Sequence, residues 1–284
     1  MEEKLRATNN HLQSVVDQLR DAQAAMDRDL CDARALQQRL LRERSGQFGD
    51  FHISLLLRPA GHIGGDMVGF FPINGQRIGI YALDVSGHGV TAALLTARLA
   101  AQLSDSTDQN IALKTTDLGL YDARSPRELL HVLNAQMLDE LRTDAYYTMV
   151  YADLDLVGGE LRLVQAGHPH PVIQRATGEI EWIGAGGLPV GVMKDAVFEE
   201  LVPQLGPGDR MLIASDGITE CETPQGEALG DDGLAGFLRG NTRLEGGALL
   251  EALSLHLTEF TGGKHVDDMS AVLIERTARP EVAP

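Results

Sequence analysis

Residues 77–89 read RIGIYALDVSGHG, an apolar run that ends in an aspartate and a glycine-rich turn. A run of this kind, bounded by turn residues, predicts a β-strand over its first eight residues. The strand would place the carboxylate of Asp84 at its end, beside the backbone carbonyl of Val85. Gly87 and Gly89 would let the chain turn sharply there and approach a ligand closely.

Three further aspartates stand in similar surroundings. Asp216 follows the apolar run 211–214, Asp267 precedes the run that begins at Met269, and Asp66 follows two glycines. Hard oxygen ligands on rigid strand ends suit divalent cations. A single Asp-Gly after a strand is more often a plain turn, but four such aspartates together favour a site assembled by the fold. Composition alone leaves metal-dependent hydrolysis and a calcium-stabilised scaffold both open.

The first 44 residues have a different pattern, because residues 2–44 contain neither glycine nor proline. Apolar residues recur there at seven-residue steps, with others three residues after some of them: Leu5, Leu12, Leu19, Met26, Ala33 and Leu40, with Val15, Ala22 and Leu36. This heptad pattern predicts a two-stranded coiled coil, and a lone helix packed along the rest of the chain is the alternative. Asp29 and Gln37 interrupt the seam, which we therefore expect to be imperfect.

The composition restricts the class of protein. The chain has 284 residues and a net charge of −17, and residues 1–48 contribute nothing to that excess, having eight basic and eight acidic residues. An acidic surface repels nucleic acid and anionic membranes. No apolar stretch reaches the roughly 18 residues of a membrane helix. The two distant cysteines, Cys31 and Cys221, favour a reduced setting, and we expect a cytoplasmic protein.

After residue 48 the sequence alternates short apolar runs with turns. Strands are predicted over residues 51–57, 77–84, 147–155, 160–165, 197–202, 209–215 and 269–275. Helices are predicted over 90–103, 125–141, 232–239 and 246–260, and a long surface loop over 105–124. This order predicts an α+β fold in which two antiparallel sheets pack together between helices, with an N-terminal coiled-coil helix.

Several motifs together resemble one family, the PP2C-type (PPM) metal-dependent serine/threonine phosphatases, in the bacterial branch similar to SpoIIE and RsbU. The motifs are Arg58-Pro59-Ala60 with Gly64-Gly65-Asp66, Asp84-Val85-Ser86-Gly87-His88-Gly89, Ala166-Gly167-His168-Pro169, Leu188-Pro189-Val190-Gly191, Pro207-Gly208-Asp209, Ser215-Asp216-Gly217 and Asp267-Asp268-Met269-Ser270. Their order and spacing match the family over about residues 50–276.

The resemblance implies a site with two Mn²⁺ or Mg²⁺ ions. By motif, Asp84 would bridge both ions, with the Val85 carbonyl completing one of them. Asp216 and Asp267 would hold the first ion and Asp66 the second. A metal-activated water would then hydrolyse phosphoserine or phosphothreonine without a phosphoenzyme.

The sequence departs from the family in ways that concern substrate binding. Animal-type relatives have a histidine at the position of Ser86, and here His88 lies two residues further on. The phosphate-binding arginine of those relatives is displaced in this chain to Arg58. Arg58 and His88 are therefore weak candidates for substrate binding. Asp268 is expected in a surface turn, and His168 in a structural role.

The expected organisation is a coiled-coil linker over 1–48, a phosphatase domain over 49–276 and a flexible tail over 277–284. The resemblance implies a phosphorylated anti-anti-sigma (STAS-type) protein as substrate. The expected assembly is a homodimer through residues 2–44, controlled by an upstream sensor or receiver domain that this chain lacks, without nucleic acid or membrane partners. The alternative function is a non-catalytic pseudophosphatase adaptor that binds a regulatory protein.

Overall fold

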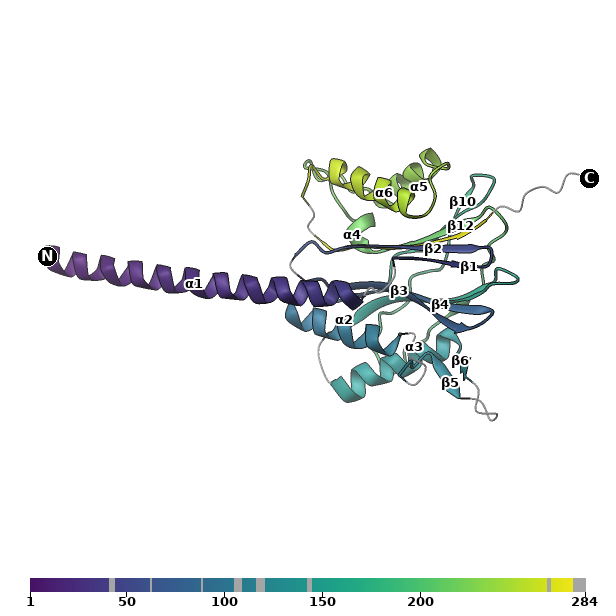
Figure 1. Cartoon of the computed structure of the whole chain (residues 1–284), viewed down its shortest axis with the longest axis horizontal. Helices are drawn as coiled ribbons and strands as arrows, with labels where there is room; N and C mark the ends of the chain where they lie inside the picture. Colours follow the sequence, from purple (N-terminus) through teal and green to yellow (C-terminus); the bar gives the residue numbers. More distant parts are fainter. Residues whose placement is uncertain are drawn as a thin grey trace, which may run out of the picture.

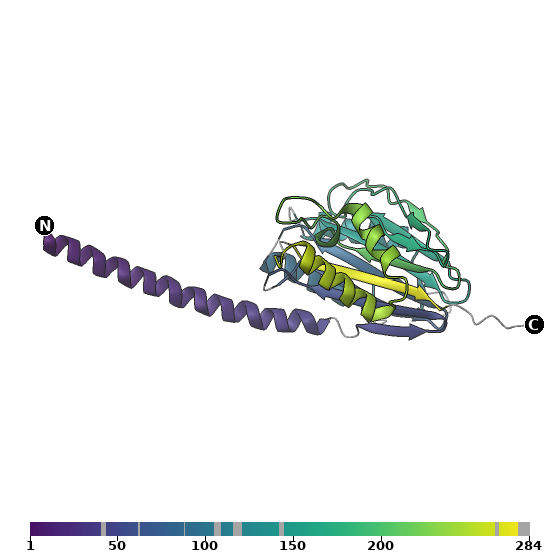
Figure 2. The same cartoon turned by 90° about the horizontal axis from the view of Figure 1, so that it is seen from above.

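Two antiparallel β-sheets pack face to face between two layers of helices, and one long helix projects from this body (Figures 1 and 2). The structure, a computed structural model, describes residues 1–40, 44–61, 63–87, 89–104, 109–115, 121–141, 145–264 and 267–277. The predicted α+β class, with two packed antiparallel sheets, flanking helices and an N-terminal helix, is confirmed.

The first sheet has six strands in the order β1-β2-β13-β12-β9-β10. Their bounds are Ser45–Phe48 (β1), Phe51–Arg58 (β2), Met269–Arg276 (β13), Arg210–Ala214 (β12), Val172–Gln174 (β9) and Ile180–Trp182 (β10). Its outer face is covered by helices α5 (Gly230–Gly240) and α6 (Gly246–Phe260), with the short helix α4 (Asp216–Thr219) at one end (Figure 1).

The second sheet has five strands in the order β11-β8-β7-β4-β3. Their bounds are Glu200–Leu201 (β11), Leu161–Ala166 (β8), Tyr147–Asp155 (β7), Arg77–Val85 (β4) and Asp66–Asn74 (β3). Helices α2 (Val90–Gln102) and α3 (Pro126–Ala135) cover its outer face. Strands β5 (Leu113–Thr115) and β6 (Tyr121–Ala123) form a separate two-stranded ribbon.

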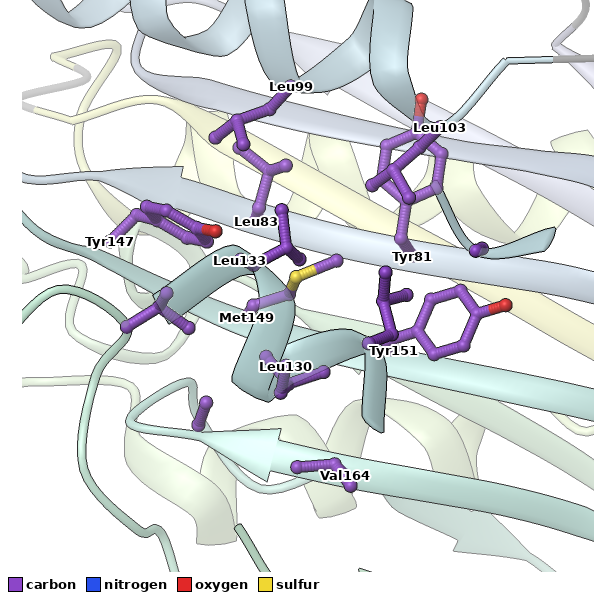
Figure 3. Close-up of a cluster of buried hydrophobic side chains, with 14 of the residues drawn as sticks. Tyr81, Leu83, Leu99, Leu103, Leu130, Leu133, Tyr147, Met149, Tyr151 and Val164 are labelled. Carbon is purple, nitrogen blue, oxygen red and sulfur yellow. The ribbon is translucent and has the colours of Figure 1, made fainter. Parts of the chain in front are cut away.

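Alternation along the strands divides the core into layers. On β4, Ile78, Ile80 and Ala82 face the first sheet, whereas Tyr81 and Leu83 face the helices. Figure 3 shows the helix-facing layer, in which the side chains of α2 and α3 meet those of β4 and β7. Each sheet packs against helices on one face and against the other sheet on the opposite face. Both faces of its strands are therefore buried, and polar residues are tolerated mainly at the strand ends.

Some predicted elements need correction. The region 105–124, expected as a loop, contains the ribbon β5–β6. The helix predicted over 125–141 is an α-helix only to Ala135 and continues as a π-helix, η1 (Gln136–Leu141). The strand predicted over 197–202 shortens to Glu200–Leu201. Strands β1, β3, β9 and β10 were not predicted, since they are short or interrupted by glycine and proline, which weakens the alternating pattern.

Helix α1 runs from Glu2 to Leu40 and points away from the sheets along most of its length (Figures 1 and 2). Three seam residues are largely exposed, with 56% of Leu12, 64% of Leu19 and 61% of Met26 accessible. The C-terminal part of α1 lies beside α2. Among the described residues, none of the helices is both long and apolar enough to cross a bilayer.

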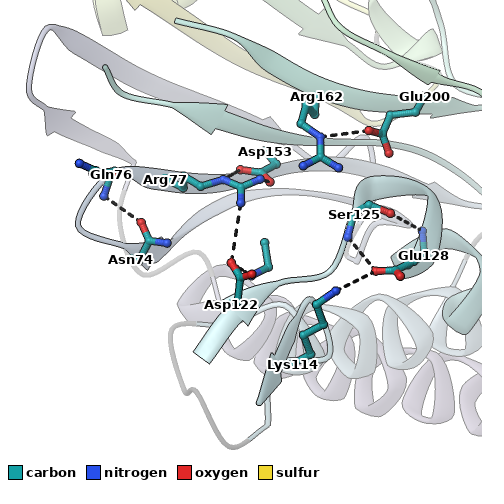
Figure 4. Close-up of polar contacts among 11 residues, drawn as sticks. Asn74, Gln76, Arg77, Lys114, Asp122, Ser125, Glu128, Asp153, Arg162 and Glu200 are labelled. Atoms are coloured by element: carbon teal, nitrogen blue, oxygen red, sulfur yellow. Dashed lines mark hydrogen bonds and ion pairs between the residues drawn. The ribbon is translucent and has the colours of Figure 1, made fainter. Parts of the chain in front are cut away.

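Charged groups inside the second sheet are paired (Figure 4). Arg77 on β4 forms an ion pair with the fully buried carboxylate of Asp153 on β7, with an Nε–Oδ1 distance of 2.9 Å. Asp122 of the ribbon lies 3.8 Å from the same guanidinium and so connects the ribbon to the sheet. At the start of α3, Ser125 and Glu128 form a reciprocal capping box, which fixes the beginning of that helix.

Replacing the arginine of this pair should destabilise the protein. In Arg77→Ala the carboxylate of Asp153 stays buried without its ion-pair partner, and the free energy of unfolding should fall by about 3 kcal/mol. Lys114→Ala is the matched control, because its pair with Glu128 is exposed at both ends and should contribute less than about 1 kcal/mol. Urea denaturation measures both values, and equal losses would contradict the prediction.

Candidate active site

Strand pairing in the second sheet brings two of the four aspartates together. Asp66 begins β3 and Asp84 lies near the end of β4, and the antiparallel register places them directly opposite each other. The Cβ atoms of residues opposite each other lie about 5 Å apart, so their carboxylates share one small region. Gly65 permits this approach, because a Cβ atom at residue 65 would lie 2.7 Å from the carbonyl oxygen of Val85.

The other two aspartates come from the first sheet. Asp216 lies two residues after β12, as the first residue of α4, and Asp267 lies two residues before β13, which pairs antiparallel with β12. The end of one strand therefore lies beside the start of the other. Gly217 is required here because a Cβ atom at that position would collide with the backbone carbonyl of Asp268. The same end of the sandwich thus collects carboxylates from both sheets.

Three of these aspartates open onto one cavity of about 710 Å³. Its lining includes Asp84, Asp216 and Asp267, together with the residues Leu30, Ala60, Gly61, Ile63, Gly65, Val85, Ser86, Gly87, Gly89, Tyr146, Thr148 and Asp268. Asp66 is 2% exposed and lies behind this lining, next to Asp84. The structure therefore brings together all the predicted metal-binding residues, including Val85.

The clustering of acids changes their protonation. Burial, with Asp216 next in importance, raises the pKa of Asp84 to about 7. Burial and the neighbouring Asp84 raise the pKa of Asp66 well above its usual value. The pKa of Asp216 is also raised, by burial and by Asp267. Charges of one sign in a partly dry cavity oppose ionisation, and a bound cation would remove that penalty.

Asp268 does not lie in a surface turn, as the sequence analysis expected. It is buried, and its two carboxylate oxygens accept hydrogen bonds from the backbone N–H groups of Ala60 and Gly65, each 2.8 Å long. The β12–β13 end is therefore joined to the segment that precedes Asp66. Asp268 thus links the start of β13 to the segments that follow β2 and precede β3.

The Gly64-Gly65 segment has two more contacts. The side-chain amide of Gln37 on α1 donates to the carbonyl of Gly64 (2.7 Å) and accepts from its N–H (3.1 Å), and this side chain is 7% exposed. The hydroxyl of Thr96 on α2 donates to the carbonyl of Gly65 (2.7 Å). The residues just before Asp66 are therefore held by α1, by α2 and by Asp268.

Of the two substrate-binding candidates, Arg58 is not among the residues that line the cavity. Arg58 lies at the end of β2, where its guanidinium is 2.7 Å from a carboxylate oxygen of Glu251 on α6. His88 lies outside the described residues. Ser86 does line the cavity, and its hydroxyl accepts a hydrogen bond from the backbone of Tyr146. A role for Arg58 in substrate binding remains a prediction without support from the geometry.

The residues fit a pair of hard divalent cations in their donor chemistry. Among the described residues, no group of three or more histidine, cysteine, aspartate or glutamate side chains already has the geometry of a metal site. The donors present are nonetheless carboxylates and a carbonyl, which Mg²⁺ and Mn²⁺ prefer. One oxygen of Asp66, Oδ2, is buried without any hydrogen-bond partner. A buried carboxylate oxygen in that position is costly unless a ligand completes it.

Sequence reasoning did not identify Gln37 and Thr148 as parts of this site. Gln37 interrupts the apolar heptad seam, and its contact to Gly64 supplies a reason for that interruption. Thr148 lies in a strand of ordinary β-branched and aromatic residues, and only the register with Asp84 reveals its place. Long-range pairing of this kind leaves no local signal.

Two packed antiparallel sheets with flanking helices and an acidic cavity at one end define a PP2C-like phosphatase fold. Residues 74–277 match the family model described as Stage II sporulation protein E (SpoIIE). The chain therefore belongs to the SpoIIE family, whose model matches more than half of its length.

Individual relatives agree with this assignment. Over 158 residues the chain is 27% identical to phosphoserine phosphatase RsbP of Bacillus subtilis, covering 56% of this chain and 37% of RsbP. It is 25% identical over 209 residues to phosphoserine phosphatase RsbU of the same organism, covering 73% of this chain and 58% of RsbU. The chain thus spans less than two thirds of the length of either relative.

A solved structure supports the fold. The SiaA-PP2C domain of Pseudomonas aeruginosa superposes with a TM-score of 0.74 at 22% identity, covering 90% of this chain and 98% of that domain. The PP2C-like fold is thus shared even though most of the sequence differs.

The raised pKa of Asp84 gives metal-free protein a particular pH dependence. Its usual value is about 4 in the unfolded chain and about 7 when folded, so the native state binds more protons between those values. This group therefore stabilises the protein below about pH 4, and the contribution is lost as the pH rises to about 7. In EDTA, Asp84→Asn should gain stability over the wild type across that range, by up to about 1.4 kcal/mol per pH unit.

Urea denaturation at several pH values measures this difference. Asp232→Asn, which changes an exposed aspartate on α5, is the matched control and should run parallel to the wild type. Parallel curves for Asp84→Asn as well would show that this carboxylate titrates normally.

Proposed function

We propose that this protein is a metal-dependent protein serine/threonine phosphatase. One observation carries the proposal: Asp84, Asp216 and Asp267, from both sheets of a PP2C-like fold, line a single cavity, and Asp66 lies directly behind them, opposite Asp84. The phosphoserine phosphatases RsbP and RsbU are relatives of this chain, and the PP2C family is metal-dependent. Two Mn²⁺ or Mg²⁺ ions are the proposed cofactors.

The residues of the chain have distinct proposed tasks. Asp84 would serve both ions, and the Val85 carbonyl would serve one of them. Asp216 and Asp267 would hold the first ion, and Asp66 the second. When bound, a pair of such ions supplies an activated water and neutralises phosphate charge. The protein contributes fixed positions for the carboxylates, and it keeps Asp66 away from bulk water. Because the proposed attack comes from water, Cys221 and Ser215 are not needed as nucleophiles.

The proposed substrate is a phosphorylated regulatory protein in the cytoplasm. The resemblance to the RsbU-like branch implies a STAS-type regulator of a partner-switching pathway. Three of the four aspartates line the cavity, and the cations that they would hold there would attract the phosphate of a phosphoserine. The acidic chain would still repel nucleic acid, which supports a protein substrate.

A non-catalytic adaptor is the second candidate. An adaptor with this fold needs a surface that binds its partner protein, but it does not need the metal ligands. Here all four aspartates are present and converge, which favours the enzyme. Turnover decides between the two, because an adaptor would bind its partner and hydrolyse nothing.

Replacing one of the proposed metal ligands should abolish the activity. With Mn²⁺, the protein should hydrolyse p-nitrophenyl phosphate and a phosphoserine peptide, and EDTA should stop both reactions. Asp216→Asn should lower kcat/KM by at least about a hundredfold, because it removes a charged metal ligand. Changes to residues that only support such ligands already lower activity by up to about a hundredfold. Steady-state kinetics at saturating Mn²⁺ measure the effect.

Asp232→Asn is again the control and should retain wild-type kinetics, since residue 232 is exposed on α5. Full activity in Asp216→Asn, or hydrolysis that survives EDTA, would contradict a two-metal phosphatase. Metal binding without any turnover would favour the adaptor.

We further propose that α1 controls the site. Its Gln37 amide holds the Gly64 backbone, two residues before Asp66, while the N-terminal part of the same helix projects away from the sheets. A shift or rotation of α1 would therefore act on the second-ion ligand. Thr96 couples α2 to the neighbouring residue, so α1 and α2 can respond together.

Loss of the Gln37 contact should weaken metal activation. Gln37→Ala removes two hydrogen bonds to Gly64, and the Mn²⁺ concentration for half-maximal activity should rise about fivefold or more, with each bond worth about 1 kcal/mol. Gln13→Ala, on the exposed part of α1, is the control and should leave that concentration unchanged. Equal metal requirements for the two variants would exclude this route of control.

The exposed seam of α1 is the proposed dimer interface. Leu12, Leu19 and Met26 lie in one heptad position and are each more than half exposed in the single chain. Leu19→Lys should therefore shift the protein from dimer to monomer in sedimentation equilibrium, because it places a charge in an apolar seam. Gln13→Lys, off the seam, should stay dimeric, and a monomeric wild type would contradict the pairing.

A further inference from the structure

A threonine lies in line with the acidic residues of the second sheet. The β4–β7 register places Thr148 directly opposite Asp84, and the β3–β4 register places Asp66 on the other side of Asp84. The three residues therefore form one row across adjacent strands, facing the same side of the sheet. Thr148 lines the active-site cavity, and its side chain is only partly buried.

The hydroxyl of Thr148 is fixed by a buried histidine. The Oγ1 atom lies 2.9 Å from Nδ1 of His168, in the turn that follows β8. That ring is 2% exposed, and burial lowers its pKa to about 3, so it is neutral at physiological pH. Gln165 holds the turn, because its side-chain amide donates to the carbonyl of His168 (2.6 Å).

A neutral imidazole carries one proton, and its location decides what Thr148 can do. The Nε2 atom is buried without a hydrogen-bond partner. A proton on Nε2 would therefore be an orphaned N–H donor, which buried structures avoid. A proton on Nδ1 is instead donated to Thr148 Oγ1, and only a lone pair remains unpaired.

This tautomer leaves the proton of the Thr148 hydroxyl available. Among the described residues, the hydroxyl has no hydrogen-bond partner besides His168. The cavity is lined by Asp84, Asp216 and Asp267, which repel a phosphate ester. A neutral hydroxyl whose proton is free to donate a hydrogen bond can attract a phosphoryl oxygen within this acidic cavity.

We propose that Thr148 binds a phosphoryl oxygen of the substrate through its hydroxyl proton, and that His168 is the positioning residue that makes the hydroxyl a donor. This inference rests on the proposed phosphatase function and adds a phosphate-binding residue to it. It also assigns a task to the histidine of the Ala166-Gly167-His168-Pro169 motif beyond filling the core.

Matched variants of Thr148 test the proposal. Thr148→Val removes the hydroxyl and keeps the branched shape, whereas Thr148→Ser keeps the hydroxyl. At saturating Mn²⁺, Thr148→Val should raise the inhibition constant of inorganic phosphate and the KM for p-nitrophenyl phosphate by about tenfold or more, as expected for a hydrogen bond to a charged group. Thr148→Ser should stay within about twofold of the wild type.

The Mn²⁺ requirement separates this role from a structural one. If Thr148 only supports Asp84, Thr148→Val should raise the Mn²⁺ concentration for half-maximal activity and leave phosphate inhibition unchanged. That result would overturn the proposal. An unchanged metal requirement with weakened phosphate inhibition would support it.

The tautomer can be measured without activity. Long-range ¹H–¹⁵N NMR of the metal-free protein at pH 7, with the His168 signals assigned through His168→Asn, should show the proton on Nδ1. A proton on Nε2 would overturn the proposal. If the wild type hydrolyses nothing, the proposed function fails, and calorimetry of inorganic phosphate with Mn²⁺-loaded wild type and Thr148→Val still decides whether the hydroxyl binds phosphate.

Discussion

Electrostatic repulsion among carboxylates is the constraint on which this structure depends. Asp66, Asp84 and Asp216 all have raised pKa values, because they are buried close to other acids. Without a counter-charge, such a cluster would push its members apart. The fold resists this, since strand register fixes Asp66 opposite Asp84, and Asp268 joins the start of β13 to the segments after β2 and before β3 by two backbone hydrogen bonds. The fold therefore pre-arranges the charges that a cation would neutralise.

The Gly64-Gly65 segment is the point where the rest of the molecule meets this cluster. Side chains of Gln37, Thr96 and Asp268, from three separate parts of the chain, all bind its backbone. Both glycines are needed, because a Cβ atom at residue 64 would collide with Asp268 and one at residue 65 would crowd Val85. The backbone just before Asp66 is therefore held by three separate elements of the fold.

The sequence predicted the strand ends and their aspartates but not the contacts that support them. Asp84 and Asp216 follow apolar runs, which are local signals; the structure places Asp84 near the end of β4 and Asp216 two residues after β12, at the start of α4. The functions of Asp268 and Gln37 depend on residues more than 25 positions away, so no local pattern reveals them. The strands β9 and β10 were missed because three-residue strands carry too little alternation, and the ribbon β5–β6 for the same reason.

The cost of the acidic cluster itself argues for a function that uses charge. Each raised pKa marks a carboxylate whose ionised form the folded protein disfavours, so the cluster lowers stability near neutral pH when no cation is bound. A partner-binding scaffold would gain stability if asparagine replaced any of these residues. Unfavourable charge interactions concentrated at one cavity are typical of a functional site, where residues serve chemistry at the expense of stability. A cation bound in this cavity would remove that cost, which supports the proposed metal-dependent activity.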